Sequence, residues 1–167
     1  EVDDPAQLLT LSDGDLHRHT FRRHNMEVQQ YLPFFNERRV IALRGRSELS
    51  WKNPGQTVPF YMQSILGGSN DLRGFRPWRL YGDNLILFNA EYRYEVFAGM
   101  DMAIFGDAGK VFDSKSQWNV HNLEGAYGVG LRFNARNNVF LRIDAGFSHE
   151  GFQVWLKFND VFAPLLR

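Results

Sequence analysis

The sequence predicts an all-β fold, an antiparallel up-and-down transmembrane β-barrel of about eight strands. Three observations predict it. Apolar residues recur with a period of two over most of the chain, as they do in strands. The alternating segments are about 10–14 residues long, above the globular mean of about 5–6 and enough to cross a bilayer when tilted. Aromatic residues are frequent, with 15 Phe, 6 Tyr and 4 Trp, although the mean hydropathy is −0.38.

Seven segments alternate in this way, and we expect strands at 21–32, 39–51, 85–97, 100–112, 124–135, 138–149 and 152–160. Residues 6–12 could supply an eighth. One face of each segment is apolar and aromatic. The opposite faces carry both signs of charge, including Arg44, Arg46, Glu48, Glu91, Arg93, Arg132, Arg142 and Asp144. A soluble β-sandwich alternates likewise. The strand length and the nearly charge-free aromatic faces favour lipid outside and paired charges inside.

The connections differ between the two ends of the predicted barrel. The short turns are 33–38, 98–99 and 134–137, and the long loops are 52–83 and 113–122. The exception is the tight connection at Glu150-Gly151, which is short but lies at the end of the long loops. Short turns at one end and long loops at the other are typical of bacterial outer-membrane barrels. The loop 52–83 has no periodicity of its own, so we expect it to be either functional or disordered.

Charge and cysteine content exclude several classes of function. The 19 Lys and Arg residues balance 19 Asp and Glu residues, whereas a nucleic-acid binder normally has a basic excess, so we expect no nucleic-acid partner. The absence of cysteine excludes disulfide scaffolds, thiolate zinc sites and cysteine nucleophiles. Residues 1–5 are acidic and turn-like, unlike a signal segment, so an exported protein would be processed or cut from a longer chain.

The long loop carries the stretch Leu66-Gly67-Gly68-Ser69-Asn70-Asp71-Leu72-Arg73-Gly74-Phe75. Here the chain resembles the BamA/TamA family of outer-membrane barrel proteins (the bacterial surface antigen family). In that family Gly-Gly precedes Val/Leu-Arg-Gly-Phe/Tyr in a loop that folds back into the barrel. Three further stretches, 89–93, 105–111 and 127–132, match the family pattern in the same order. The resemblance implies a location in the bacterial outer membrane. The family has sixteen strands, whereas we expect seven or eight here. The chain would therefore be either a small barrel or the C-terminal half of a 16-stranded barrel.

A guanidinium folded into a barrel interior must meet carboxylates, because an unpaired buried charge is very costly. Glu91 and Asp107 face inward on the two strands after the loop, so Arg73 can reach one or both. The resemblance implies that Arg73 locks the loop onto these carboxylates, with Gly74 allowing close approach and Phe75 wedging against the wall. The loop glycines before the motif are Gly67 and Gly68. The alternative is an exposed loop that carries Arg-Gly-Phe by chance, and the companion stretches disfavour it.

The last strand resembles the C-terminal signal by which barrel precursors are recognised. The residues that carry this resemblance are Gly151, Val154, Leu156, Phe158 and Phe162. An aromatic edge strand can pair with an exposed strand of an assembly machine by β-augmentation. The same strand is also a lipid-facing barrel strand, and the two interpretations are compatible.

Other constellations are weaker. His17 and His19 share a strand face but have no identifiable third ligand, so we expect no metal site. The neighbours Ser148-His149-Glu150 alternate between faces and cannot form a local triad, so we expect no catalytic residue, no enzyme activity and no cofactor. Arg22-Arg23 and Arg38-Arg39 would meet anionic head groups near the two ends, although any barrel rim carries such charges.

The resemblance implies a role in the assembly or insertion of outer-membrane proteins. The expected partners are outer-membrane lipids, client β-barrel precursors and periplasmic assembly factors. The alternative is a structural barrel or membrane anchor without insertase activity, such as the C-terminal barrel of a fused patatin-like enzyme. The chain departs from the family because it lacks substrate-docking repeats and has about half the strands. We expect one outer-membrane barrel domain over residues 1–167, complete in itself, part of a larger barrel, or completed by self-association.

Overall fold

The computed structural model describes residues 21–35, 38–53, 57–135 and 138–158. Its main element is a seven-stranded sheet in the order β1-β2-β5-β6-β7-β8-β9, and every neighbouring pair is antiparallel. The strands are β1 (Phe21–Phe34), β2 (Arg39–Lys52), β5 (Asn84–Phe97), β6 (Met100–Phe112), β7 (Glu124–Ala135), β8 (Asn138–Ser148) and β9 (Gly151–Phe158). The seven predicted strands are therefore confirmed, with bounds that differ by a few residues.

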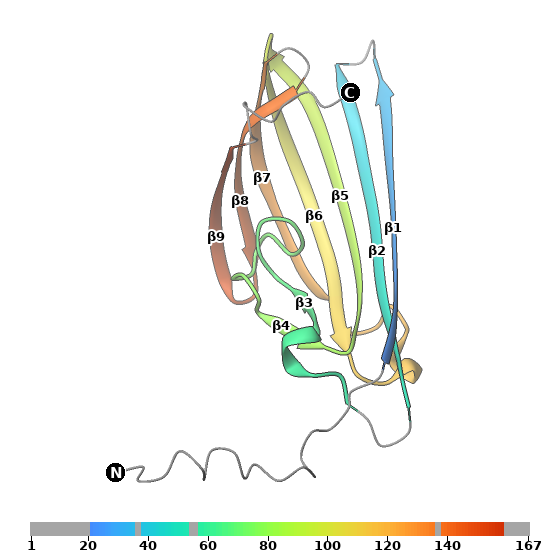
Figure 1. Ribbon diagram of the computed structural model, residues 1–167. Coiled ribbons are helices and arrows are strands. Elements are labelled where there is room, and N and C mark those ends of the chain that lie inside the picture. Colours follow the sequence, from blue (N-terminus) through green and yellow to red (C-terminus); the bar gives the residue numbers. More distant parts are fainter. Residues whose placement is uncertain (1–20, 36–37, 54–56, 136–137, 159–167) are drawn as a thin grey trace, which may run out of the picture.

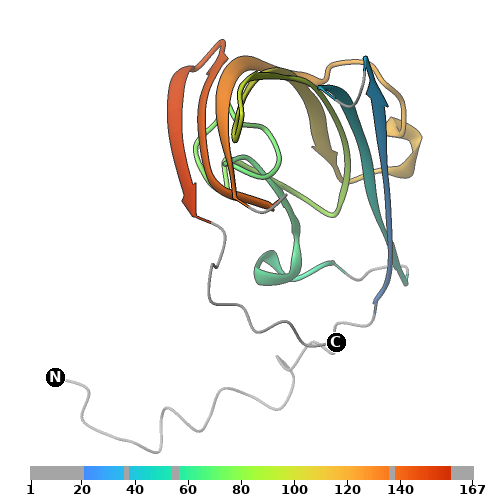
Figure 2. The ribbon, with the colours of Figure 1, turned by 90° about the horizontal axis from the view of Figure 1, so that it is seen from above.

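The sheet curls into part of an up-and-down barrel that is open on one side, as seen in Figures 1 and 2. Its edge strands are β1 and β9, and neither has a second hydrogen-bonded neighbour among the described strands. The predicted eighth strand at 6–12 and the signal residue Phe162 lie outside the described residues. No helix in the described part of the chain is long and apolar enough to cross a membrane.

The two faces of the sheet differ as the alternation predicts. Outward-facing side chains such as Met26, Val28, Tyr127 and Val154 are 62–69% exposed, as expected for a wall that contacts lipid. The inner face carries all the carboxylates of the seven strands: Glu27, Glu48, Glu91, Glu95, Asp101, Asp107, Glu124 and Asp144. The interior therefore collects the negative charge of the sheet.

The loop between β2 and β5 folds back into the concave side of the sheet (Figure 1). It contains the short 3₁₀ helix η1 (Phe60–Met62) and a small hairpin of β3 (Ser64–Leu66) and β4 (Leu80–Gly82). The main core lies between this loop and the wall, and it consists of Leu66, Leu72, Phe75, Leu85, Leu87 and Ala126. The expectation of a charge-filled interior was thus incomplete, because the loop brings its own apolar residues to cover Leu85 and Leu87.

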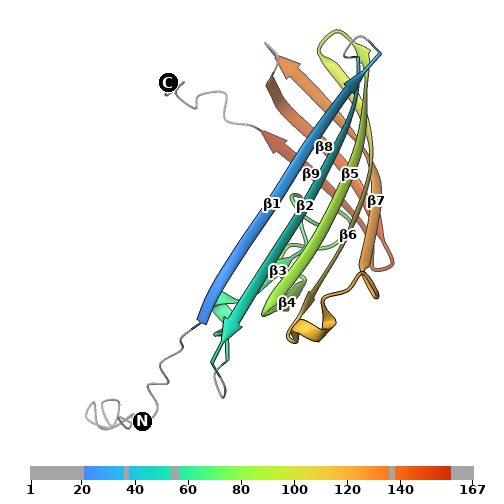
Figure 3. The same cartoon turned by 90° about the vertical axis from the view of Figure 1, so that its right-hand side faces the viewer.

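The loop between β6 and β7 folds in the opposite sense, over the outer wall (Figure 3). It contains the 3₁₀ helix η2 (Lys115–Gln117), and Leu123 packs on a buried outer cluster of Leu49, Ile86 and Phe112. This end of the outer wall is therefore covered by protein, and the exposed apolar residues of the outer face begin beyond it.

Candidate functional site

Two glycines set the entry of the loop into the interior. Gly67 and Gly68 have φ angles of 113° and 105°, a backbone region that non-glycine residues rarely adopt. A Cβ on Gly67 would also lie 3.1 Å from the backbone nitrogen of Arg79 in the returning chain. The turn after them is held by hydrogen bonds from the Asp71 nitrogen to the Gly68 carbonyl and from the Phe75 nitrogen to the Leu72 carbonyl. This geometry points the intervening Arg73 at the wall.

Arg73 contacts both carboxylates that the sequence places on the inner face. Its Nε and Nη2 donate to Oδ2 and Oδ1 of Asp107 at 2.8 and 2.7 Å, and its backbone nitrogen donates to Oδ2 at 3.1 Å. Its Nη1 donates to Oε2 of Glu91 at 2.5 Å. The guanidinium also lies 3.5 Å from the ring centroid of Phe105. Arg73, Glu91 and Asp107 are 3–7% exposed, so these ion pairs are almost entirely shielded from solvent.

The wall adds three further arginines to this network. Arg132 on β7 donates to Glu91 at 2.9 and 3.2 Å and pairs with Asp144 on β8 at 2.7 Å. Arg93 donates to Glu91 at 2.6 Å, and Arg142 pairs with Asp144. Sequence reasoning placed these residues on the inner face without assigning them to the site. The signal that identifies them is their shared inner face on the nearby strands β5, β7 and β8.

Close backbone contact fixes the loop on β8. A Cβ on Gly74 would lie 2.6 Å from the Phe147 carbonyl oxygen, and a Cβ on Gly146 would collide with the carbonyl of Arg73. The Ser148 hydroxyl donates to the Gly74 carbonyl at 2.8 Å. Two facing glycines therefore allow the loop to lie directly against the wall. Sequence reasoning assigned close approach to Gly74 and did not identify Gly146.

The loop also reaches the edge strand β9. The indole Nε1 of Trp155 donates to the Arg73 carbonyl at 2.7 Å, and Lys157 bonds the side chain of Asn70. Neither contact was predicted, because sequence alternation assigns a face and not a partner.

Phe75 is 1% exposed and packs into the main core, with its ring centroid 5.5 Å from that of His149 on the β8–β9 turn. It thus lies between the loop and the wall.

The other residues of the predicted C-terminal signal lie on the open side of the sheet. Gly151 has a φ of 126° in the turn that starts β9. Val154, Leu156 and Phe158 face outward and are 62, 58 and 70% exposed.

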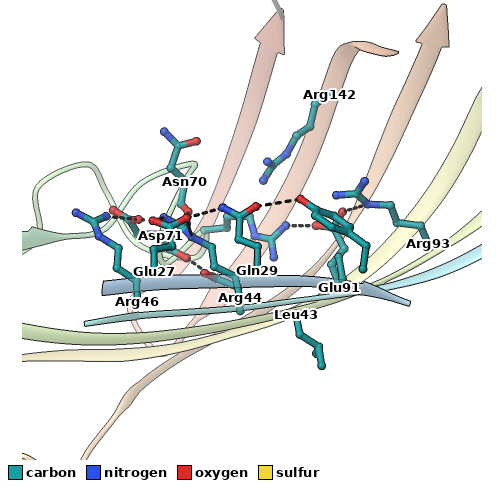
Figure 4. Close-up of a pocket in the computed structure, with 14 residues that line it drawn as sticks. Glu27, Gln29, Leu43, Arg44, Arg46, Asn70, Asp71, Glu91, Arg93 and Arg142 are labelled. Carbon is teal, nitrogen blue, oxygen red and sulfur yellow. Dashed lines mark hydrogen bonds and ion pairs between the residues drawn. The ribbon is translucent and has the colours of Figure 1, made fainter. Parts of the chain in front are cut away.

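A second polar cluster lies between the loop tip, β1 and β2 and lines a pocket of about 440 Å³ (Figure 4). Arg44 donates to Glu27 at 2.9 Å and to the Asn70 carbonyl at 2.7 Å, while Arg46 lies 3.3 Å from Asp71. Burial raises the pKa of Asp71, against the lowering effect of the two arginines. The tip of the loop is thus held by charged groups on the β1 side as well as on the β9 side.

The described residues contain no group of three His, Asp or Glu side chains that could hold a metal ion. In the stretch Ser148-His149-Glu150, the Ser148 hydroxyl donates to the Gly74 carbonyl, and His149 lies 3.4 Å from Glu124. The predicted pair His17 and His19 lies outside the described residues.

Comparisons with known proteins give a family and a fold. The family model described as the Omp85 superfamily domain matches residues 9–159. Among solved structures, the chain is similar to BamA from Haemophilus ducreyi lacking POTRA domains 1–3, with a TM-score of 0.68 and 18% sequence identity. The match covers 80% of this chain and 34% of that chain, so this chain spans about a third of its structural relative. A search of curated proteins finds no match.

Proposed function

The chain belongs to the Omp85 superfamily, and from this premise we propose that it takes part in the assembly or insertion of β-barrel proteins in the bacterial outer membrane. The proposal rests on how the loop lock and the open sheet edge are joined.

The open edge supplies the reactive surface. β9 ends the described sheet, so a row of its backbone N–H and C=O groups has no strand partner there. In lipid such groups are costly, which favours the addition of a further strand. A client strand that pairs with β9 would gain backbone hydrogen bonds and would continue the apolar outer face of Val154 and Leu156.

The lock supplies the rigid support, and the hydrogen bond from Trp155 to Arg73 is the observation that carries the proposal. Arg73 is fixed by Asp107 and Glu91 on the strands β6 and β5. Through its carbonyl, the same residue fixes Trp155 on the edge strand. The edge is therefore held in an orientation set by the buried charges, and release of the loop would free it.

The partners follow from this surface. We propose outer-membrane lipids for the apolar outer face, and client β-barrel precursors with periplasmic assembly factors for the edge. Self-association would complete the barrel by pairing the edges of two copies. We propose no enzyme activity, since the Ser148 hydroxyl and His149 are engaged with different groups.

The test reconstitutes the chain in lipid vesicles, adds a urea-unfolded client barrel and follows the heat-resistant folded fraction on gels. Vesicles with the chain should fold the client faster than vesicles with an unrelated small barrel. The variant Trp155→Phe keeps an aromatic side chain and loses the N–H donor, so it should fold normally and accelerate the client less. If the chain and the unrelated barrel give equal client folding, the protein is a structural barrel or anchor.

A further inference from the structure

The basic residues on the outer face of the sheet lie at its ends. On the described strands the outer face carries no Asp or Glu, and its Lys, Arg and His residues are Arg22, His24, Arg39 and Lys110. Arg22 and His24 stand at the start of β1, at the end where the long loops leave the sheet (Figure 3). The inner face holds basic residues as well as all the carboxylates of the strands, so the charged groups left on the outer face are basic only.

Trp51 gathers three cationic or ionisable side chains at this end. Arg22 is its direct cross-strand neighbour on the outer face. The ring of His24 meets the indole edge-on, with 4.7 Å between centroids. Nζ of Lys115, from the loop folded over the outer wall, lies 4.1 Å from the centroid of the indole ring. Residues from β1, β2 and η2 therefore converge on one aromatic side chain.

The charges of this cluster have no carboxylate partner among the described residues, where neither Arg22 nor Lys115 forms an ion pair. Both side chains are exposed. Like charges that lie together repel each other unless an anion joins them. Further along the same face of β1, Met26 and Val28 are 69 and 62% exposed, as suits contact with hydrocarbon. The cluster thus lies where the apolar band ends.

We propose that Arg22, His24, Trp51 and Lys115 form a binding site for the phosphate group of an anionic membrane lipid, whose acyl chains lie along Met26 and Val28. A guanidinium binds phosphate with two parallel N–H donors, and an ammonium adds a point charge. Tryptophan favours the boundary between hydrocarbon and head groups, where its ring is apolar and its N–H is wet. The site requires only a membrane location and is independent of any assembly activity.

The test titrates the detergent-solubilised full chain with phosphatidylglycerol or phosphatidylcholine and counts bound lipids by native mass spectrometry. The double variant Arg22→Gln/Lys115→Gln should bind phosphatidylglycerol about tenfold more weakly, since each removed cation weakens attraction to an anionic lipid. Arg23→Gln is the matched control. Arg23 is the next residue of β1 but faces the interior, where its Nε donates to the Ser50 hydroxyl at 3.0 Å. Its variant should bind phosphatidylglycerol like the parent chain.

The change in gel mobility on heating first shows whether each variant folds. If the double variant does not fold, the single variant Lys115→Gln replaces it in the titration, because Lys115 is exposed and lies outside the strands. Unchanged phosphatidylglycerol binding by the folded variant would overturn the proposal, as would an equal loss in Arg23→Gln. Competition with inorganic phosphate separates the two sources of the anion. Displacement of the lipid by an equal concentration of inorganic phosphate would mean a site for free phosphate. If the parent chain binds phosphatidylglycerol as expected but does not accelerate the folding of a client barrel, the assembly function is wrong and the lipid site stands.

Discussion

Arg132 on β7 donates to Glu91 on β5 at 2.9 Å, across the intervening strand β6. The same oxygen, Oε2 of Glu91, also accepts a hydrogen bond from Nη1 of the loop residue Arg73. One buried carboxylate therefore holds both the loop and the wall, and the docking of the loop is coupled to the curvature of the sheet. Removing the shared acceptor should disturb both at once.

Glu91→Gln tests this shared role. The change keeps the shape of the side chain and removes the negative charge that faces Arg73, Arg93 and Arg132, which leaves buried cations short of a partner. We expect a loss of about 3–5 kcal/mol in the free energy of unfolding, measured by urea titration in detergent micelles. The control Glu95→Gln removes a half-exposed carboxylate 3.9 Å from Arg38 and should cost under about 1 kcal/mol. Equal losses would contradict a central role for Glu91.

Arg73→Ala leaves Asp107 buried without its bidentate partner, so the variant should lose heat-resistant folded mobility on gels. Arg73→Lys keeps the charge but cannot reproduce the fork that meets two carboxylates, and it should be intermediate. Arg79→Ala is the control from the same loop, because its partner Glu150 is exposed to solvent. Unchanged mobility of Arg73→Ala would mean that the loop is held by its apolar residues.

Gly146→Ala and Gly74→Ala should each push the loop off β8. The added methyl group meets the Arg73 carbonyl in the first case and the Phe147 carbonyl in the second, and backbone atoms cannot rotate away. Overpacking of this kind costs about 1–3 kcal/mol, and loop residues should become accessible to protease. Gly106→Ala is the matched control on β6, because nothing lies within 4 Å of its added Cβ. Similar protease patterns for all three variants would contradict the close fit of loop and wall.

The wall was predictable because strand periodicity fixes which way a side chain points. Once Glu91 and Asp107 are assigned to regular strands, their inward orientation follows from the alternation of side chains along each strand. Partners at long range do not follow from it. The hydrogen bond from Trp155 joins residues 82 positions apart, and it depends on the path of a loop that has no period.

The same limit applies to the core. Leu72 and Phe75 lie in irregular backbone, so periodicity assigns neither to a face, and their burial depends on the glycine turn that directs the loop inward. The burial of Leu72 was not predicted, and the place of Phe75 against the wall was expected only from the family resemblance. The β6–β7 loop illustrates the converse. Its Leu123 covers outward-facing Ile86, which alternation alone would assign to lipid.

Val154→Arg tests whether the outer face of β9 contacts lipid. Val154 lies near the middle of β9 and is 62% exposed, in register with Ala145 on β8. In a membrane, an arginine on the lipid face costs about 2–4 kcal/mol at mid-depth and about 0–1 kcal/mol near the interface. Val154→Arg should therefore reduce the folded fraction in vesicles far more than Phe152→Arg, which is at the turn end of the same face. A soluble β-sandwich would present both positions to water. In that case both variants would fold equally well, and the membrane assignment of this face would be wrong.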